Sequence, residues 1–163
     1  MQSCDVYFYR LANELGIDRL NGFLSEFGFG ERTGADIAGE LGGLLPSPQW
    51  KERTRKQVWY PGETLIVGIG QGSFLATPLQ LAAATAAMAN RGRYIVPRMV
   101  KATRAGVGKP LVPAEPEVRQ IAADDPRHWQ VAIDAMTAVV ESARGTARRI
   151  RSDDYRIAGK TGT

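Results

Sequence analysis

The residues best suited to chemistry stand at the carboxyl end of the chain, where an apolar run leads into Lys160, Thr161, Gly162 and Thr163. The lysine supplies a fixed positive charge, and the threonine hydroxyls can donate hydrogen bonds to a carboxylate beside it. Small residues allow a ligand to lie against the backbone edge of a strand. This order of residues is suited to binding a substrate acid along a strand. A strand that runs into a turn has a similar composition, so the motif alone leaves both interpretations open.

A second polar group, Ser3 and Asp5, precedes the aromatic and apolar run 6–12 near the start of the chain. Asp5 is predicted to be a helix N-cap, because its carboxylate can accept hydrogen bonds from the free amides of a first turn. Ser3 and Asp5 can therefore serve only to begin a helix, or they can act on a substrate. The first helix is expected to end near Gly16, and a second is expected over residues 17–27.

Cys4 lies between these two polar residues and is the only cysteine in the chain. One thiol excludes an internal disulfide and a metal motif built on paired cysteines. With a single histidine and no carboxylate cluster, we expect no metal site within the chain itself and no cofactor. Cys4 is then either a small buried thiol or a metal ligand completed by residues of a longer protein. Equal zinc content in that protein and in its Cys4→Ala variant would exclude the second interpretation.

The first half of the chain is expected to combine loops with one short helix. Glycine and proline residues over 28–61 predict a long loop. Within it, Ser47 followed by Pro48 predicts the start of a helix, and the basic residues of 51–56 are expected to be solvated. Residues 62–72 are expected to form a glycine-rich turn packed closely under a neighbouring element. Their spacing fits neither a dinucleotide-binding fingerprint nor a phosphate-binding loop.

The second half contains two better-defined helices. Thr77, Pro78 and Gln80 have the pattern of a capping box with a proline at the first helical position. The alanine and leucine residues that follow, as far as Met88, predict a helix buried on most sides. A short strand is expected over residues 94–96.

The second of these helices is expected to start at Asp125 and Pro126 and to stop at Gly145. His128 lies on its polar side and is expected to be a surface residue rather than a catalytic base. A basic cluster follows the helix, but it is short and balanced by acids, so a solvated face is a better interpretation than a nucleic-acid site. Its members are Arg144, Arg148, Arg149 and Arg151.

Composition sets broad limits on the protein. The chain has 163 residues, 44% of them hydrophobic and 23% charged, which are ordinary values for a globular domain. The net charge of +4 is compatible with an anionic partner without requiring one. The sequence contains no run of about 18 apolar residues and no visible signal peptide. Because it opens almost directly on a helical pattern and stops within a strand pattern, we expect a fragment of a larger protein.

Together, the motifs resemble those of a known family. Ser3-Cys4-Asp5 and Lys160-Thr161-Gly162 are similar to the second and third motifs of the penicillin-recognising serine enzymes, which use Ser-x-x-Lys, Ser-x-Asn/Asp and Lys-Thr-Gly. Further landmarks resemble class B penicillin-binding proteins in the same order, at residues 68–72, 77–82 and 145–147. The opening motif and residues 59–63 are most similar to the branch associated with cell elongation and rod shape. The resemblance covers essentially the whole chain.

The resemblance implies an α/β (α+β) fold, the penicillin-binding transpeptidase and serine β-lactamase-like fold, with helices packed on an antiparallel sheet. Residues 1–163 would be part of one transpeptidase domain. The implied activity is that of a peptidoglycan D,D-transpeptidase, which cross-links stem peptides through a serine acyl-enzyme and is a target of β-lactams. The implied partners are D-Ala-D-Ala stem peptides, β-lactams and membrane proteins of the elongation complex, without nucleic acid. The implied location is the periplasmic face of the inner membrane.

The resemblance also implies a role for each motif residue. Ser3 would relay a proton between the catalytic lysine and the leaving or attacking amine. Asp5 stands where many relatives have asparagine and would hold that lysine or the substrate amide. Lys160 would hydrogen-bond Ser3 and attract the substrate carboxylate. The backbone amide of Thr163 would form half of the oxyanion hole. The substrate carboxylate would be bound by Thr161, Gly162 and Thr163.

One motif of the family is missing, because none of the six serines has a lysine three residues later. We therefore expect the nucleophile, its lysine, the rest of the oxyanion hole, the pedestal domain and the membrane anchor to lie upstream of Met1. The last strands of the sheet are expected beyond Thr163, and the chain alone is expected to be inactive. Two alternatives remain open: a β-lactam sensor or hydrolase of the same fold, and a catalytically silent binding module.

Overall fold

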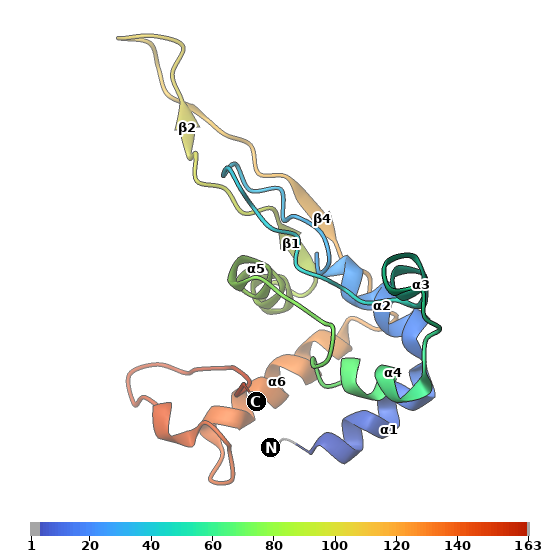
Figure 1. Ribbon diagram of the computed structural model, residues 1–163. Helices are drawn as coiled ribbons and strands as arrows, with labels where there is room; N and C mark the ends of the chain where they lie inside the picture. The colour runs from blue at the N-terminus through green and yellow to red at the C-terminus, as the bar shows by residue number, and fades with distance from the viewer. Residues whose placement is uncertain (1–3, 163) are drawn as a thin grey trace.

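The computed structural model describes residues 4–162. Within them, six α-helices form a body from which a long β-ribbon extends (Figure 1). The helices are α1 (Asp5–Leu15), α2 (Ile17–Glu26), α3 (Pro48–Arg55), α4 (Pro61–Val67), α5 (Pro78–Ala89) and α6 (Arg127–Glu141). A short 3-10 helix, η1 (Arg148–Ile150), follows α6. The strands are β1 (Arg93–Ile95), β2 (Ala102–Thr103), β3 (Val112–Pro113) and β4 (Val118–Gln120).

The hydrophobic core forms where the end of α2, helix α5, the base of the ribbon and the start of α6 meet. Its aromatic members lie in contact, since the rings of Phe27 and Trp129 are 6.1 Å apart and those of Phe29 and Phe74 are 5.4 Å apart. Small residues on one face of α5 let that helix approach the aromatic side chains. The buried cluster consists of Phe27, Phe29, Ala83, Ala84, Ala87, Tyr94, Ile121 and Trp129.

Helix α5 begins as its sequence predicts, with the Thr77 hydroxyl accepting from the Gln80 amide at 3.1 Å. The side-chain oxygen of Gln80 accepts a hydrogen bond from the Thr77 amide, and the Gln80 side chain is fully buried. Its amide group also donates to the carbonyl oxygens of Gly28, Glu31 and Gly42, so one side chain ties the long loop to the helix. The expectation that α5 is buried on most sides is wrong, because Leu81 is 52% exposed. A helix of alanine and leucine carries no polar face to indicate which side stays open.

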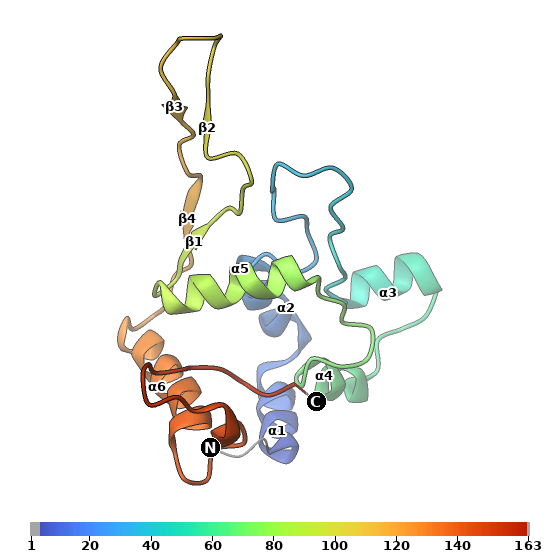
Figure 2. The same cartoon turned by 90° about the vertical axis from the view of Figure 1, so that its left-hand side faces the viewer.

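The ribbon is formed by residues 93–121 and extends far from the helical body (Figure 2). Its base is the antiparallel pair β1–β4, and its outer part is the antiparallel pair β2–β3. The long loop holds the ribbon between these two pairs, because the Asp36 carboxylate accepts hydrogen bonds from the amides of Met99 and Val100 at 2.5 and 2.8 Å. A two-stranded ribbon is only marginally stable by itself, so this contact fixes its direction.

The Asp36 contact should make the ribbon sensitive to acid. The hydrogen bonds from Met99 and Val100 lower the pKa of Asp36 below its ordinary value of 3.8. Because the pKa of Asp36 is lower in the folded state than in the unfolded state, ionised Asp36 stabilises the folded protein fully above about pH 3.8. This stabilisation is lost as the pH falls through the lowered pKa of the folded state. We expect the amide NMR shifts of Met99 and Val100 to titrate below that pH. The Asp36→Ala variant should abolish this titration and Asp124→Ala should leave it unchanged; a titration that survives Asp36→Ala would refute the assignment.

Several sequence expectations are corrected in this part of the fold. The first half of 62–72 belongs to helix α4 rather than to a turn, because Pro61 occupies the first helical turn and Glu63 accepts from the Tyr60 amide at 2.8 Å. Lys51 is buried rather than solvated. The start of α3 is confirmed, with the Ser47 hydroxyl accepting from the Trp50 amide.

Helix α6 lies where the sequence predicts it but is shorter, because its N-cap is Pro126 rather than Asp125 and it ends at Glu141, before Gly145. The helix begins at Arg127, and the Asp125 carboxylate accepts from the Arg127 amide at 2.8 Å. His128 is exposed, as predicted. Across residues 4–162, none of the helices has both the length and the apolar character that crossing a bilayer requires.

Candidate active site

Residues from the two ends of the chain line one hollow of about 410 Å³. Helix α1 contributes Asp5 and Phe8, and the residues that follow α4 contribute Gly68 and Ile69. The remaining lining residues are Lys160, Thr161 and Gly162. Asp5 and three residues of the lysine motif thus line the same hollow. The other two predicted site residues, Ser3 and Thr163, lie outside the described residues.

The start of α1 differs by one residue from its prediction. Cys4, rather than Asp5, is the N-cap, with φ −112° and ψ 95° and no side-chain capping bond. The Cys4 carbonyl accepts from the amides of Tyr7 and Phe8. Asp5 is the first helical residue, so its exposed carboxylate lies at the positive end of the helix dipole.

The Cys4 thiol is exposed, so its interpretation as a small buried thiol is wrong. Cys4 is the N-cap and has an extended backbone, so it precedes the face of α1 that packs on the rest of the molecule. This position explains why its side chain is exposed. Over residues 4–162, histidine, cysteine, aspartate and glutamate side chains form no group of three or more that could hold a metal ion.

The segment before the lysine motif is extended but is not a strand. Its contacts with α6 are a hydrogen bond from the Gly159 amide to the Met136 carbonyl at 3.1 Å and one from the Ile157 amide to Glu141 Oε1 at 3.4 Å. A strand exists only when its backbone pairs with a neighbour, and no described strand pairs with these residues. The expectation of a strand here is therefore wrong for the described residues.

The Lys160 ammonium group contacts only its neighbour among the described residues. Its Nζ donates to the Thr161 carbonyl at 2.7 Å and approaches the Thr161 hydroxyl at 3.4 Å. No carboxylate within residues 4–162 forms an ion pair with it. The exposed charge is therefore available to an anionic ligand.

Thr161 is held from the other side by the turn after α6. Its hydroxyl lies 3.3 Å from the hydroxyl of Thr146. A Cβ added at Gly145 would lie 2.2 Å from the Val139 carbonyl oxygen, so only glycine allows the turn to approach α6 this closely. The landmark at residues 145–147 thus supports the lysine motif directly.

The floor of the hollow depends on close packing between α1 and the end of α4. A Cβ added at Gly68 would lie 2.3 Å from the Ala12 Cβ, so the missing side chain of Gly68 brings the two helices together. Ala12 is itself buried. This confirms, for Gly68, the predicted close packing of the glycine-rich stretch under a neighbouring element.

Sequence reasoning missed Phe8 and Ile69 as lining residues. Phe8 could have been found, because it follows Asp5 by three residues and lies on the same helical face. Ile69 carries no such signal, since its position depends on where α4 ends.

A larger apolar hollow of about 550 Å³ opens beside the first, between α1, α2, α5 and α6. Its walls include Phe8, Phe23, Leu81 and Met136, and at one end it reaches Lys160. An exposed apolar hollow of this size typically receives another segment or partner.

The arrangement can bind a carboxylate but lacks a complete catalytic group. Lys160 and the Thr161 hydroxyl can hold an anion, and the Asp5 carboxylate can accept from an amide or ammonium group across the hollow. Among the described residues that line the hollow, no serine or cysteine is present to act as a nucleophile. The groups that line the hollow can therefore position a substrate.

The whole chain, residues 1–163, matches the family model for the penicillin binding protein transpeptidase domain. The chain therefore belongs to the penicillin-binding protein transpeptidase family, which confirms the predicted fold class.

Within the family, the chain is similar to the elongation branch. It is 49% identical over 164 residues to the peptidoglycan D,D-transpeptidase MrdA of Acinetobacter baumannii, a match that covers 100% of this chain and 24% of that protein. A crystal structure of Pseudomonas aeruginosa PBP2 in complex with WCK 5153 superposes with a TM-score of 0.79 at 51% identity, covering 90% of this chain and 31% of that one. PBP2 from Helicobacter pylori, in complex with MreC, superposes with a TM-score of 0.73 at 36% identity, covering 89% and 25%. The chain thus spans about a quarter of the length of the curated relatives it matches.

Proposed function

We propose that this chain is the substrate-binding part of a peptidoglycan D,D-transpeptidase that cross-links stem peptides through a serine acyl-enzyme. The observation that carries the proposal is the hollow that Asp5, Lys160 and Thr161 line together. Asp5 belongs to one motif and Lys160 and Thr161 to the other, although the two motifs come from opposite ends of the chain. Family membership supports the same activity.

In the proposed mechanism, Lys160, Thr161 and Gly162 bind the terminal carboxylate of a D-Ala-D-Ala stem peptide or of a β-lactam. The unpaired charge of Lys160 supports this role, because a charge-assisted hydrogen bond is roughly twice as strong as a neutral one. Asp5 holds the substrate amide or the catalytic lysine. Ser3 relays a proton to the amine, and the Thr163 amide supplies half of the oxyanion hole.

The nucleophile of this reaction must come from a segment other than residues 4–162. We propose that a Ser-x-x-Lys segment of a longer protein packs in the larger apolar hollow. That hollow is lined by aromatic and aliphatic side chains and ends at Lys160, so a helix seated there could present a serine to the smaller hollow. Burial of the apolar surface would supply the free energy for its packing.

The proposal extends to partners and location. The named complex of the Helicobacter pylori relative with MreC supports membrane proteins of the elongation machinery as partners of the longer protein. Peptidoglycan stem peptides and β-lactams are the proposed ligands. We place the longer protein at the periplasmic face of the inner membrane, where such substrates occur, with an anchor outside this chain.

Intact mass after incubation with benzylpenicillin tests the proposed function. We expect a single penicilloyl adduct on the longer protein that includes the upstream segment, and none on residues 1–163 alone. An adduct on residues 1–163 would place the nucleophile within this chain and contradict the mechanism. If neither protein is labelled, the catalytically silent module is the better account. If the adduct forms and is then rapidly hydrolysed, the protein is a hydrolase.

A further inference from the structure

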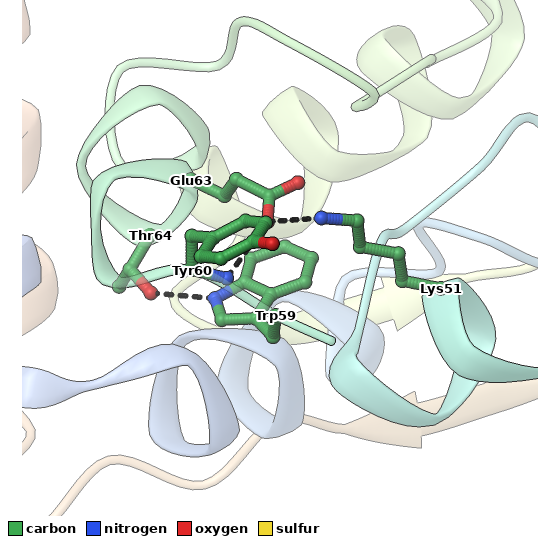
Figure 3. A network of polar contacts seen from close by, with 5 residues as sticks. All are labelled: Lys51, Trp59, Tyr60, Glu63 and Thr64. Atoms are coloured by element: carbon green, nitrogen blue, oxygen red, sulfur yellow. Dashed lines mark hydrogen bonds and ion pairs between the residues drawn. The ribbon is translucent and has the colours of Figure 1, made fainter. Parts of the chain in front are cut away.

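An ion pair between a buried lysine and a partly exposed glutamate joins α3 to α4. Lys51 Nζ lies 2.6 Å from Glu63 Oε2, and the Lys51 side chain is only 4% exposed. Figure 3 shows Lys51 reaching from α3 towards the start of α4, with the Tyr60 ring beside it. The same carboxylate oxygen accepts from the Tyr60 amide at 2.8 Å. One oxygen of Glu63 thus fixes both the first turn of α4 and the neighbouring helix.

A second contact fixes the same turn. The Trp59 indole donates to the Thr64 hydroxyl at 2.9 Å, and Thr64 is buried. Burial alone raises the pKa of Glu63, but the hydrogen bonds from Lys51 and from the Tyr60 amide lower it below its ordinary value of 4.5. The carboxylate is therefore ionised near neutral pH, and the pair is intact there.

The far end of α4 forms the floor of the smaller hollow. The helix has seven residues and is about 10 Å long. It ends directly before Gly68 and Ile69, which line the hollow together with Lys160. Because Gly68 packs without a side chain against Ala12, any movement of α4 also moves α1, the helix that begins with Asp5. The ion pair is thus connected to the hollow by one short, rigid element.

We propose that Lys51 and Glu63 are positioning residues for the transpeptidase site, which set the place of Gly68, Ile69 and Asp5 through α4. Neither Lys51 nor Glu63 lines the hollow, so the action of the pair passes through the helix. This inference rests on the proposed function for its catalytic consequence. Its structural consequence, the position of the end of α4, is independent of any activity.

Removal of the pair separates positioning from stability. Glu63→Gln leaves the buried Lys51 ammonium group without its partner, and it should be the most destabilising change of the set. Lys51→Met leaves the Glu63 carboxylate unpaired, but that side chain is 29% exposed, so its loss of stability should be smaller. The double variant Lys51→Met/Glu63→Gln leaves no buried charge, so its midpoint of urea unfolding should return towards that of the wild type. If the pair only stabilises the fold, the acylation rate of the double variant should recover together with its stability. If the pair positions α4, the acylation rate of the double variant should stay low, because the connection between α3 and α4 is absent.

The experiment uses the longer protein that contains this chain, with two measurements. The first is hydrogen exchange at the amides of Gly68, Gly70 and Gln71, which bond to the carbonyls of Thr64, Val67 and Ile66. The second is the rate of acylation by benzylpenicillin. In the double variant we expect exchange at these amides to be at least about tenfold faster and acylation at least about tenfold slower than in the wild type.

Gln80→Leu is the matched control, because it removes buried hydrogen bonds from α5 without touching either end of α4. It should lower stability while leaving exchange at the three amides and the acylation rate within about twofold of the wild type. Wild-type exchange at these amides in the double variant would overturn the proposal. If the wild-type protein forms no adduct at all, the proposed function fails, and the exchange result still decides whether the pair positions α4.

Discussion

Replacing Lys160 by alanine in the longer protein is expected to slow acylation by benzylpenicillin by about 100-fold or more. Its ammonium group is exposed, has no carboxylate partner among residues 4–162 and lines the hollow that also contains Asp5. Loss of one preorganised group that stabilises charge in an active site typically costs about 100-fold to 1000-fold in rate. Stability should change little, because the side chain makes only local contacts.

Lys109→Ala is the matched control for this result. Lys109 is an exposed cation in the outer part of the ribbon, so its loss changes the net charge by the same amount without altering the hollow. Stopped-flow measurement of acylation at several penicillin concentrations should show the loss for Lys160→Ala alone. Equal rates in the two variants would mean that Lys160 acts only through general electrostatic attraction.

The second large effect is expected at Gly68. In Gly68→Ala the new methyl group would lie 2.3 Å from the Ala12 Cβ, and neither atom belongs to a flexible side chain that could move aside. Helices α1 and α4 must therefore separate, which should lower the free energy of unfolding by about 1–3 kcal/mol. The same movement displaces Asp5 relative to Lys160, so acylation should fall by at least about tenfold.

The double variant Gly68→Ala/Ala12→Gly provides the control, because it moves the methyl group from one helix to the other. Ala12→Gly alone should cost about 1 kcal/mol through the conformational freedom of glycine in a helix. If close packing is the cause, the double variant should be more stable than the sum of the two single effects predicts. Strictly additive changes in urea unfolding would show that the contact between residues 12 and 68 is not responsible.

The sequence was sufficient to predict features that depend on local chemistry. The capping box at Thr77 and Gln80 and the proline start after Ser47 follow from hydrogen bonds within a few residues, and both are present. The close approach at Gly68 was anticipated as well. That Asp5 and Lys160 belong to one site was inferred from the order of the family motifs, because no local pattern connects residues so far apart.

Features that depend on distant neighbours were not predictable in this way. Lys51 lies in a basic run that predicts a solvated face, and it is buried only because Glu63 lies opposite on another helix. The sequence did not predict helix α4, because the glycine residues that follow the helix dominate the composition of residues 62–72. The apolar run before Lys160 has the composition of a strand, but a strand also requires a partner that the described residues do not provide.

The position of a bound β-lactam would show whether Lys160 and Thr161 bind the substrate carboxylate. A crystal structure of the penicilloyl form of the longer protein would show where the ligand carboxylate binds. We predict that this carboxylate lies within about 3 Å of the Thr161 hydroxyl and beside Lys160 Nζ, with the ligand amide directed towards Asp5. A ligand whose carboxylate lies outside the hollow between α1 and residues 160–162 would contradict it.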